Sequence, residues 1–408
     1  MQKKLLTLAV AGALAAPAAA LAQVEVYGTI HMSLNRMDYG EGTGGIPSVK
    51  KFDVASHASN VGVRARESLG GGLSAWVQVE TNASMERSNN IAHTSNFASR
   101  NSAIGMQGGF GNIFIGQWTT PWTDLDALWG IGTVATYGPI TSIIGRRETT
   151  GSAPNPSCAN NFSGNGGGPL PGGVGATLPT CDSVEAAGGV GHAFWRRISN
   201  SVHYQSPVFG GAQLKIAYQT NQDKASTGPG AGADPSMWSG SATWSGLGGR
   251  LRVGAAFDAH KDFTTVGQTD KGWRVTGGWN FGFADIGAAY ETMEYKLAAG
   301  DCEAKQWGIQ AAIPLGQGAI RGAFSTADDL EGPAVGCAGD NGADQWNIGY
   351  DYRFSKRTTV GVGWAQIKND AGARFTWSGL SSANNGQDIT PPAGSDVKIL
   401  FVSMIHRF

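Results

Sequence analysis

Apolar and polar positions alternate along most of the chain, in segments of about ten residues. From Val24 to Asn35, apolar residues and one glycine occupy the even positions, while polar residues such as Glu25 and Ser33 occupy the odd positions. Successive side chains of a β-strand point to opposite faces, so a period of two predicts a strand with one apolar face. Amphipathic helices, which a soluble protein of this length would normally contain, are almost absent outside residues 118–150.

Sixteen segments fit this alternation, and we predict a strand in each. They lie near residues 23–36, 58–67, 72–82, 98–107, 111–117, 198–206, 211–220, 236–245, 249–259, 272–281, 284–293, 304–314, 318–327, 343–353, 357–367 and 396–408. The last one is apolar at Leu400, Val402 and Met404, and we expect the chain to end on it with Phe408. An apolar edge strand invites pairing with other chains, and closing the sheet into a barrel removes that edge.

The connections between these segments alternate in length. Short glycine-containing turns, such as 68–71 and 281–283, supply the positive φ angles of tight hairpins. Long Gly-, Ser-, Asn- and Asp-rich connections lie at 37–57, 84–97, 118–197, 221–235, 260–271, 294–303, 328–342 and 368–395. This form predicts an all-β fold, a 16-stranded antiparallel transmembrane β-barrel. A β-propeller would need a repeated blade motif, which we do not find.

The first residues of the chain have the pattern of a secretory signal peptide. Lys3 and Lys4 precede the apolar run 5–14, and Ala20-Leu21-Ala22 supplies a cleavage site, so we predict a signal peptide over 1–22 and a barrel over 23–408. An uncleaved anchor is the alternative, but its apolar core is too short to span a bilayer. After residue 23 no stretch approaches ~20 consecutive apolar residues, so we expect no transmembrane helix.

The mature chain is weakly acidic. Removing Lys3 and Lys4 from the 30 basic residues leaves 28 against 31 acidic ones, a net charge of −3. Nucleic-acid binding requires an excess of Lys and Arg to neutralise phosphates, so we expect no nucleic-acid partner. The export signal and the barrel pattern together predict the outer membrane of a Gram-negative bacterium.

The polar face of the predicted strands carries many charges. The basic residues on it are Arg64, Arg66, Lys215, Arg250, Arg252, Arg274, Arg321 and Arg353, and the acidic ones are Glu25, Glu80, Asp258, Asp285, Glu291 and Asp351. A lumen packed solid with ion pairs is one interpretation. A barrel of sixteen strands is too wide for side chains to fill, so we expect water to enter and the charges to act on permeating ions.

The apolar face is marked by aromatic residues near the ends of the segments. They are Trp238, Trp244, Trp273, Trp279, Trp307, Trp346, Tyr350, Tyr352, Trp364 and Phe408. Aromatic girdles at both lipid–water interfaces are typical of membrane barrels. The alternative, a buried aromatic core, would need a second layer of sheet that the sequence does not provide.

The connection 118–197 is far longer than the others, which indicates a function. Its first residues, 118–129, are partly apolar and can form a helical turn. We predict that it folds into the lumen as a constriction loop, with Asp124, Asp126 and Glu148 facing the wall arginines across the pore. An external lid is the alternative.

Four cysteines, Cys158, Cys181, Cys302 and Cys337, fall in predicted external loops. An exported chain passes through an oxidising compartment, so we expect disulfides. Three pairings are possible, of which Cys158–Cys181 with Cys302–Cys337 is the most local. No Cys-x-x-Cys spacing occurs and the seven histidines lack metal-ligand spacing, so we expect no metal and no cofactor.

The sequence contains no short motif for a catalytic nucleophile with its histidine and carboxylate, so we expect a protein that is not an enzyme. A substrate-specific channel is the stronger alternative to a general one. Trp118, Trp122, Trp129 and Trp195 could form an aromatic track for sugars or other planar solutes, or they could pack the inserted loop against the wall.

Four motifs resemble one family. Residues 60–73 (NVGVRARESLGGGL), 108–117 (GGFGNIFIGQ), 197–207 (RISNSVHYQSP) and 405–408 (IHRF) are similar to segments of the general trimeric porins of Neisseria, Bordetella and Burkholderia. They correspond there to the second strand, the strand leading to the constriction loop, the strand after it, and the terminal strand. The resemblance covers essentially the whole mature chain.

The resemblance implies a homotrimer in outer-membrane lipid and lipopolysaccharide that lets ions and small hydrophilic solutes diffuse passively. It also implies that the third external loop bends into the pore, that Arg64 and Arg100 are basic residues of the constriction, and that Phe408 is read during membrane insertion. Asn60 and Gln117 stand where the family pattern usually has arginine, which weakens an expectation of strong anion preference.

Overall fold

The computed structural model describes residues 23–83, 85, 97–129, 137–139, 142–144, 194–220, 234–263, 267–297, 300–333, 337, 339–377 and 391–408. The predicted signal peptide, residues 1–22, lies outside the described residues. So do Glu148, Cys158 and Cys181, and with them a constriction role for Glu148 and a Cys158–Cys181 disulfide.

The described residues form seventeen strands and two helices of four residues each. The strands are β1 (Gln23–Tyr39), β2 (Val49–Ser56), β3 (Asn60–Gly70), β4 (Leu73–Asn82), β5 (Ser102–Gly108), β6 (Gly111–Thr119), β7 (Arg197–Gln205), β8 (Ala212–Gln219), β9 (Ser236–Gly246), β10 (Leu251–Lys261), β11 (Thr269–Asn280), β12 (Asp285–Leu297), β13 (Gly300–Leu315), β14 (Gly318–Ala327), β15 (Ala343–Arg353), β16 (Thr358–Asn369) and β17 (Val397–Arg407). The helices are α2 (Pro121–Asp124) and α3 (Asp126–Trp129), and neither has the length and apolarity that crossing a membrane requires.

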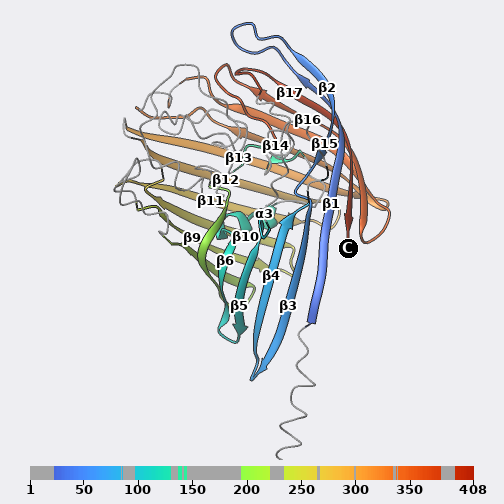
Figure 1. The fold of residues 1–408 in the computed structure, drawn as a ribbon. Helices are drawn as coiled ribbons and strands as arrows, with labels where there is room; N and C mark the ends of the chain where they lie inside the picture. Colours follow the sequence, from blue (N-terminus) through green and yellow to red (C-terminus); the bar gives the residue numbers. More distant parts are fainter. Residues whose placement is uncertain are drawn as a thin grey trace, which may run out of the picture.

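The strands form one antiparallel sheet that closes on itself (Figure 1). From β3 to β17 consecutive strands pair along the chain, and β1 pairs with β17 from Thr29↔Arg407 to Tyr39↔Val397. Phe408 continues this seam, because its backbone N–H donates to the Gly28 carbonyl at 3.1 Å. The predicted closure of the last segment against the first is therefore confirmed.

β2 and β3 occupy successive stretches of the same neighbour, β1, with pairs Met32↔Ser56 and Thr29↔Asn60 on either side of a short interruption. They act as one barrel strand, so the seventeen described strands make a 16-stranded barrel, as predicted. The prediction of loop structure throughout 37–57 is wrong, because residues 49–56 are strand. Lys50 on one face and Lys51 and Asp53 on the other hide the alternation there, and pairing with β1 supplies the strand instead.

A second predicted loop, 294–303, is also mostly strand. β12 runs to Leu297 and β13 begins at Gly300, with pairing from Asp285↔Ala312 as far as Leu297↔Gly300. The sequence prediction ended both strands of this hairpin too early. The outer part of the hairpin carries charged residues on its outward face, among them Glu294 and Lys296. Those charges replace the apolar residues on which the sequence prediction relied.

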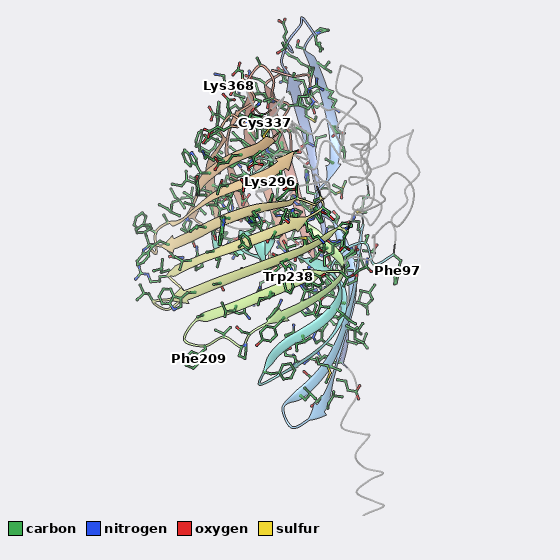
Figure 2. The ribbon with its side chains drawn as sticks, turned by 90° about the vertical axis from the view of Figure 1, so that its left-hand side faces the viewer. Phe97, Phe209, Trp238, Lys296, Cys337 and Lys368 are labelled. Carbon is green, nitrogen blue, oxygen red and sulfur yellow. A yellow bond between two sulfur atoms is a disulfide. The ribbon has the colours of Figure 1, made fainter. Side chains whose placement is uncertain are left out.

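The two ends of the barrel differ. The β3–β4 turn is a short one in which Gly70, Gly71 and Gly72 adopt φ angles of 85°, 59° and 80°, a left-handed region that favours glycine. Figure 2 shows Phe209 at the tip of another short turn, and Cys337 and Lys368 toward the opposite end, where the long connections lie. The predicted segregation of short turns and long loops is confirmed.

The outer surface of the barrel is apolar. On β1, Val24 and Val26 are 63% and 61% exposed, and on β17 the alternate residues Leu400, Val402 and Met404 are about half exposed. Large apolar side chains that stand in a continuous exposed band are suited to the hydrocarbon of a bilayer rather than to water.

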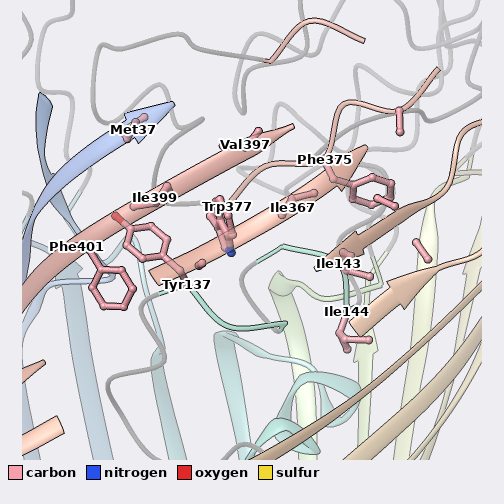
Figure 3. Close-up of a cluster of buried hydrophobic side chains, with 14 of the residues drawn as sticks. Met37, Tyr137, Ile143, Ile144, Ile367, Phe375, Trp377, Val397, Ile399 and Phe401 are labelled. Carbon is pink, nitrogen blue, oxygen red and sulfur yellow. The ribbon is translucent and has the colours of Figure 1, made fainter. Parts of the chain in front are cut away.

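The inner face of β17 is apolar as well. Val397, Ile399 and Phe401 point to the side opposite the exposed residues and belong to a buried cluster with Tyr137 and Trp377 (Figure 3). Tyr137 and Trp377 lie outside the strands, and their side chains cover this part of the inner wall. The alternation suggests a polar inner wall, but the inner wall is apolar at this strand.

A disulfide joins Cys302 in β13 to Cys337 in the connection between β14 and β15. This is the second of the two most local pairings that the sequence allowed. The Glu303 N–H donates to the Glu331 carbonyl at 2.7 Å, and the Glu331 N–H donates to the Glu303 carbonyl at 3.0 Å. The 328–342 connection is thereby held against the rim of β13.

Replacing Cys302 and Cys337 together by serine is expected to destabilise this external connection. The bridge closes a loop with a sequence separation of 35, and native disulfides of this kind contribute about 2–4 kcal/mol. Limited proteolysis should cleave the variant within 328–342 much faster than the parent, while the barrel fragment stays resistant. Equal cleavage rates would contradict the assignment of this role.

Candidate functional site

Most of the basic residues predicted for the site on the inner wall are paired with acidic ones. The pairs are Arg64–Glu25 at 2.8 Å, Arg100–Glu80 at 2.5 Å, Lys215–Asp124 at 2.7 Å and Arg252–Asp285 at 2.6 Å, together with Arg274–Asp126 and Arg321–Asp351. Six of the predicted site cations thus have a carboxylate partner. The inner wall carries many charges but little net charge at each of these points.

Strand register produces these pairs. Glu25 and Arg64 stand directly opposite each other on β1 and β3, and the guanidinium binds both carboxylate oxygens, at 2.8 and 3.0 Å. Arg252 on β10 reaches Asp285 on β12 across the intervening strand β11. It can do so because Gly278 of β11 has no side chain, and a Cβ there would lie 2.5 Å from the Arg252 guanidinium.

A chain of polar contacts extends from the wall to the helical segment. The Tyr27 hydroxyl donates to Glu80 at 3.0 Å, and Glu80 also binds Arg100. Farther along the wall, Asn101 donates weakly to the Thr119 hydroxyl, and that hydroxyl to Asp124, both at 3.4 Å. The backbone between Arg100 and Asn101 joins these two sets of contacts, of which the second ends at the helical segment.

Local sequence explains the helical segment. The Thr120 hydroxyl accepts a hydrogen bond from the Thr123 N–H and caps α2, and Pro121 follows at the first helical position, where its missing N–H does no harm. The turn buries Trp122 and Leu125 completely, and α3 buries Trp129. Helices of four residues are not stable alone, so burial against the barrel holds them in place.

The wall accommodates α3 at glycines. A Cβ on Gly287 of β12 would lie 2.3 Å from the Trp129 carbonyl oxygen, and one on Gly278 would lie 2.5 Å from the Leu128 carbonyl oxygen. A Cβ on Gly254 of β10 would meet the Leu128 side chain at 2.5 Å. Any other residue at Gly287 or Gly278 would collide with backbone, so these positions permit the close approach of the segment.

Arg274 on β11 is the anchor of the segment. Its side chain is fully buried, it contacts Asp126 of α3, and its Nη1 donates to the Trp122 carbonyl at 3.4 Å. Glu291 on β12, also fully buried, lies 3.6 Å from its Nε. On the other side of the segment, the Gln310 amide donates to the Trp129 carbonyl at 2.6 Å.

Asp124 and Asp126 contact wall cations directly, whereas the sequence suggested that they face wall arginines across an open constriction. The difference arises because the helical turns dock against the wall, and a buried carboxylate needs a partner at hydrogen-bond distance. Burial raises the pKa of Asp124, and the Lys215 ammonium opposes that rise. Asp126 also accepts a hydrogen bond from the Trp195 indole at 2.6 Å.

Two predicted site cations have no carboxylate partner among the described residues. Arg66 donates to the Ser74 hydroxyl, and Arg250 donates to the Asn280 carbonyl at the turn end of the barrel. The suggested aromatic track does not form from Trp122 and Trp129, which are completely buried and pack the segment against the wall.

The sequence reasoning missed an aromatic cluster on the inner wall. Trp76 of β4 lies with its ring centroid 5.3 Å from Phe114 and 5.8 Å from Trp118, both of β6. Phe114 in turn stacks on His203 of β7 at 4.7 Å. The signal was present, because Trp76 shares its strand face with Ser74, Gln78 and Glu80 rather than with Ala75 and Val77.

Three carboxylates of the external connections, Asp329, Asp340 and Asp370, lie within 4.8 Å of one another and could hold a cation. Burial and the charges of Asp340 and Asp329 raise the pKa of Asp370. Asp329 accepts hydrogen bonds from the N–H groups of Asn341 and Gly342, at 2.7 and 2.8 Å. These two contacts lie within the 328–342 connection, and the Ala371 N–H donates to the Asp340 carboxylate at 3.3 Å, so hydrogen bonds hold the three carboxylates in place.

A closed barrel with an apolar outer surface and a charged inner wall defines the class: an outer-membrane channel protein. A family model described as Gram-negative porin matches residues 7–372, and the chain belongs to this family. The protein is therefore a channel for passive diffusion in the outer membrane of a Gram-negative bacterium.

Curated relatives share the whole length. The major outer membrane protein P.IB of Neisseria lactamica is 26% identical over 382 residues, which cover 91% of this chain and 96% of that protein. The protein of the same name from Neisseria gonorrhoeae is 25% identical over 380 residues, covering 90% and 94%.

Solved structures share the fold. An anion-selective porin from Comamonas acidovorans matches 95% of this chain and 100% of that chain with a TM-score of 0.62 at 20% identity. OmpT of Vibrio cholerae, solved in a trimer form, matches 95% of this chain and 99% of that chain with a TM-score of 0.58 at 15% identity.

Proposed function

We infer that this porin conducts ions and small hydrophilic solutes of either charge with weak selectivity. The observation that carries this inference is the pairing of the inner-wall cations, since six of the predicted site cations contact a carboxylate. A wall whose charges are balanced pair by pair produces fields that fall off quickly with distance, so neither sign of ion is strongly excluded. This agrees with the departures from the family's arginine pattern at Asn60 and Gln117.

The connection 118–197 narrows the lumen. Support comes from α2 and α3, which pack against β8–β12, and from Tyr137, Ile143 and Ile144, which are buried in the cluster on the inner face of β17. Both parts of the connection lie on the side of the wall away from the exposed apolar residues. Space inside the barrel is thereby reduced from two directions.

The proposal is tested by reconstitution of the purified protein in planar bilayers. Large, ohmic and weakly selective conductance steps are expected. Small steps that one solute class blocks completely would instead favour a substrate-specific channel, and the absence of any conductance would overturn both.

Charge reversal at Arg64 is expected to shift the reversal potential in a salt gradient toward cations. Arg64→Glu removes one positive charge and places a second carboxylate opposite Glu25 on a wall that is half exposed to the lumen. The control is Arg357→Glu in the short β15–β16 turn, which changes the net charge of the protein by the same amount. If the two variants shift the potential equally, or not at all, Arg64 does not act on permeating ions.

The protein is a homotrimer. The aromatic residues that mark a lipid-facing surface lie on β7 and β9–β16, for example Trp238, Trp273 and Trp307. The large apolar side chains exposed on β17, β1, β3, β4, β5 and β6 are aliphatic instead, and this aliphatic face suits contact with a second copy of the chain, while the rest of the surface meets lipid and lipopolysaccharide. Conductance steps that occur in threes are the expected readout, and single steps would contradict the trimer.

A substrate preference is the second candidate function, and the aromatic cluster at Trp76 favours it. Aromatic rings on the inner wall do not serve an interface with lipid. They offer a surface for planar solutes.

A further inference from the structure

The inner wall of β1 and β3–β7 contains a hollow of about 360 Å³. Its lining combines the aromatic cluster, two arginines, the Glu25 carboxylate that pairs with Arg64, and a set of amides: Trp76, Phe114, Trp118, Arg66, Gln78 and Asn112 are among its residues. The described part of the helical segment packs on β8–β12 and leaves this side of the wall to the lumen. The hollow therefore lies beside the path of a permeating solute.

The aromatic floor of the hollow is held rigidly. Phe114 is buried between His203, on which it stacks, and the two indoles, with a ring-centroid distance of 5.1 Å to Trp118. The Trp76 indole N–H donates to the Asn112 side chain at 2.8 Å, which fixes the orientation of the ring. Trp76 and Trp118 keep part of their surface open to the hollow.

Arg66 brings a positive charge that no carboxylate of the described residues balances. Its Nε and Nη2 both donate to the Ser74 hydroxyl, at 3.2 and 2.9 Å. A guanidinium has five N–H donors in a planar fork that fits a carboxylate, so most of its donors stay available. The neighbouring Arg64 differs, since Glu25 binds it in a bidentate manner.

We propose that this hollow is a binding site for small aromatic carboxylates, with the ring on Trp76 and Trp118 and the carboxylate on Arg66. The amides of Gln78 and Asn112 at its edge would receive ring substituents that form hydrogen bonds. The volume lies at the small end of the range for ligand pockets, which suits a solute of one ring. A neutral sugar would use the rings but leave the excess charge of Arg66 without a partner.

This inference rests on the proposed function, because a site on the lumen wall acts on solutes only in a conducting channel. Affinity must stay low enough for release, and a shallow hollow with one charged contact meets that condition. The site concentrates its ligand beside the pore without blocking the passage of other solutes.

The test uses benzoate as the probe, with the protein in planar bilayers at about 0.1 M KCl, where charge screening is moderate. Benzoate is expected to raise current noise and lower the current at concentrations several-fold below those of cyclohexanecarboxylate, which has the same charge and a similar size but no aromatic ring. Arg66→Gln should weaken the benzoate effect about tenfold or more, and Trp76→Leu should abolish the preference over cyclohexanecarboxylate.

Arg357→Gln is the matched control, since it removes the same charge from a short turn outside the hollow. It should leave the benzoate effect unchanged. Equal effects of benzoate and cyclohexanecarboxylate on the parent, or an equal loss in the two arginine variants, would overturn the site while the porin function stands. A parent protein that does not conduct at all would overturn the proposed function instead. If Trp76→Leu does not insert into the bilayer, the two arginine variants and the two probes still show whether the hollow binds aromatic carboxylates.

Discussion

Replacing Gly287 with valine is expected to displace α3 from the barrel wall and to raise the single-channel conductance. A Cβ at this position would lie 2.3 Å from the Trp129 carbonyl oxygen and 2.8 Å from its Cα, so the backbone of α3 must move. Overpacking of this kind typically destabilises by about 1–3 kcal/mol. The docked turns are short and have little stability of their own, so the segment should yield before the strand does.

The matched control is Gly277→Val on the neighbouring strand β11. The closest atom to a Cβ there is the Arg252 carbonyl oxygen at 3.4 Å, an ordinary contact distance. This variant should conduct like the parent. If Gly287→Val also conducts like the parent and folds normally, then the α2–α3 segment does not narrow the lumen.

Replacing Arg274 with leucine is expected to have the largest effect on stability. The arginine is fully buried, contacts Asp126, and lies 3.6 Å from the fully buried Glu291. Removing one partner of a buried ion pair leaves a buried charge without compensation, which typically lowers stability by about 3–5 kcal/mol. Denaturant titration of the protein in detergent, followed by tryptophan fluorescence, measures this loss as a fall in the free energy of unfolding.

The double variant Arg274→Leu/Glu291→Leu separates charge from packing. It removes the Glu291 carboxylate as well, and buried pairs can often be replaced by apolar residues with little loss. The double variant should therefore recover a substantial part of the stability, while Asp126 keeps its hydrogen bond with Trp195. A double variant that is less stable than Arg274→Leu would show that the anchor depends on something other than the balance of charge.

The site was predicted only in part from the sequence. Alternation identified the residues of the polar strand face, among them Arg64, Lys215, Arg252, Arg274 and Arg321. The face of a residue depends only on whether its position is odd or even along the strand. It could not show which carboxylate each cation contacts. That choice depends on register and on gaps such as Gly278, through which Arg252 reaches Asp285.

The aromatic residues show the same division. From the sequence, four tryptophans of the long connection region could form one aromatic track. The structure buries Trp122 and Trp129 under the docked segment and joins Trp118 to Trp76, which is 42 positions away in the printed sequence. Only the pairing of β4 with β5 and of β5 with β6 brings these two side chains together.

By itself, the sequence determined most of the strands, the sixteen-stranded barrel and its closure, the outer apolar surface and hence the class of channel. These features follow from a period of two and from connection length, which are properties of neighbouring residues. The tertiary structure alone decided how the lumen is filled. β17 is apolar on both faces, one for the outer surface and one for Tyr137 and Trp377 inside, and a strand pattern cannot tell these two apolar environments apart. The same long-range packing pairs the charges and leaves Arg66 beside the aromatic hollow, because residues distant in sequence meet only when the sheet has closed.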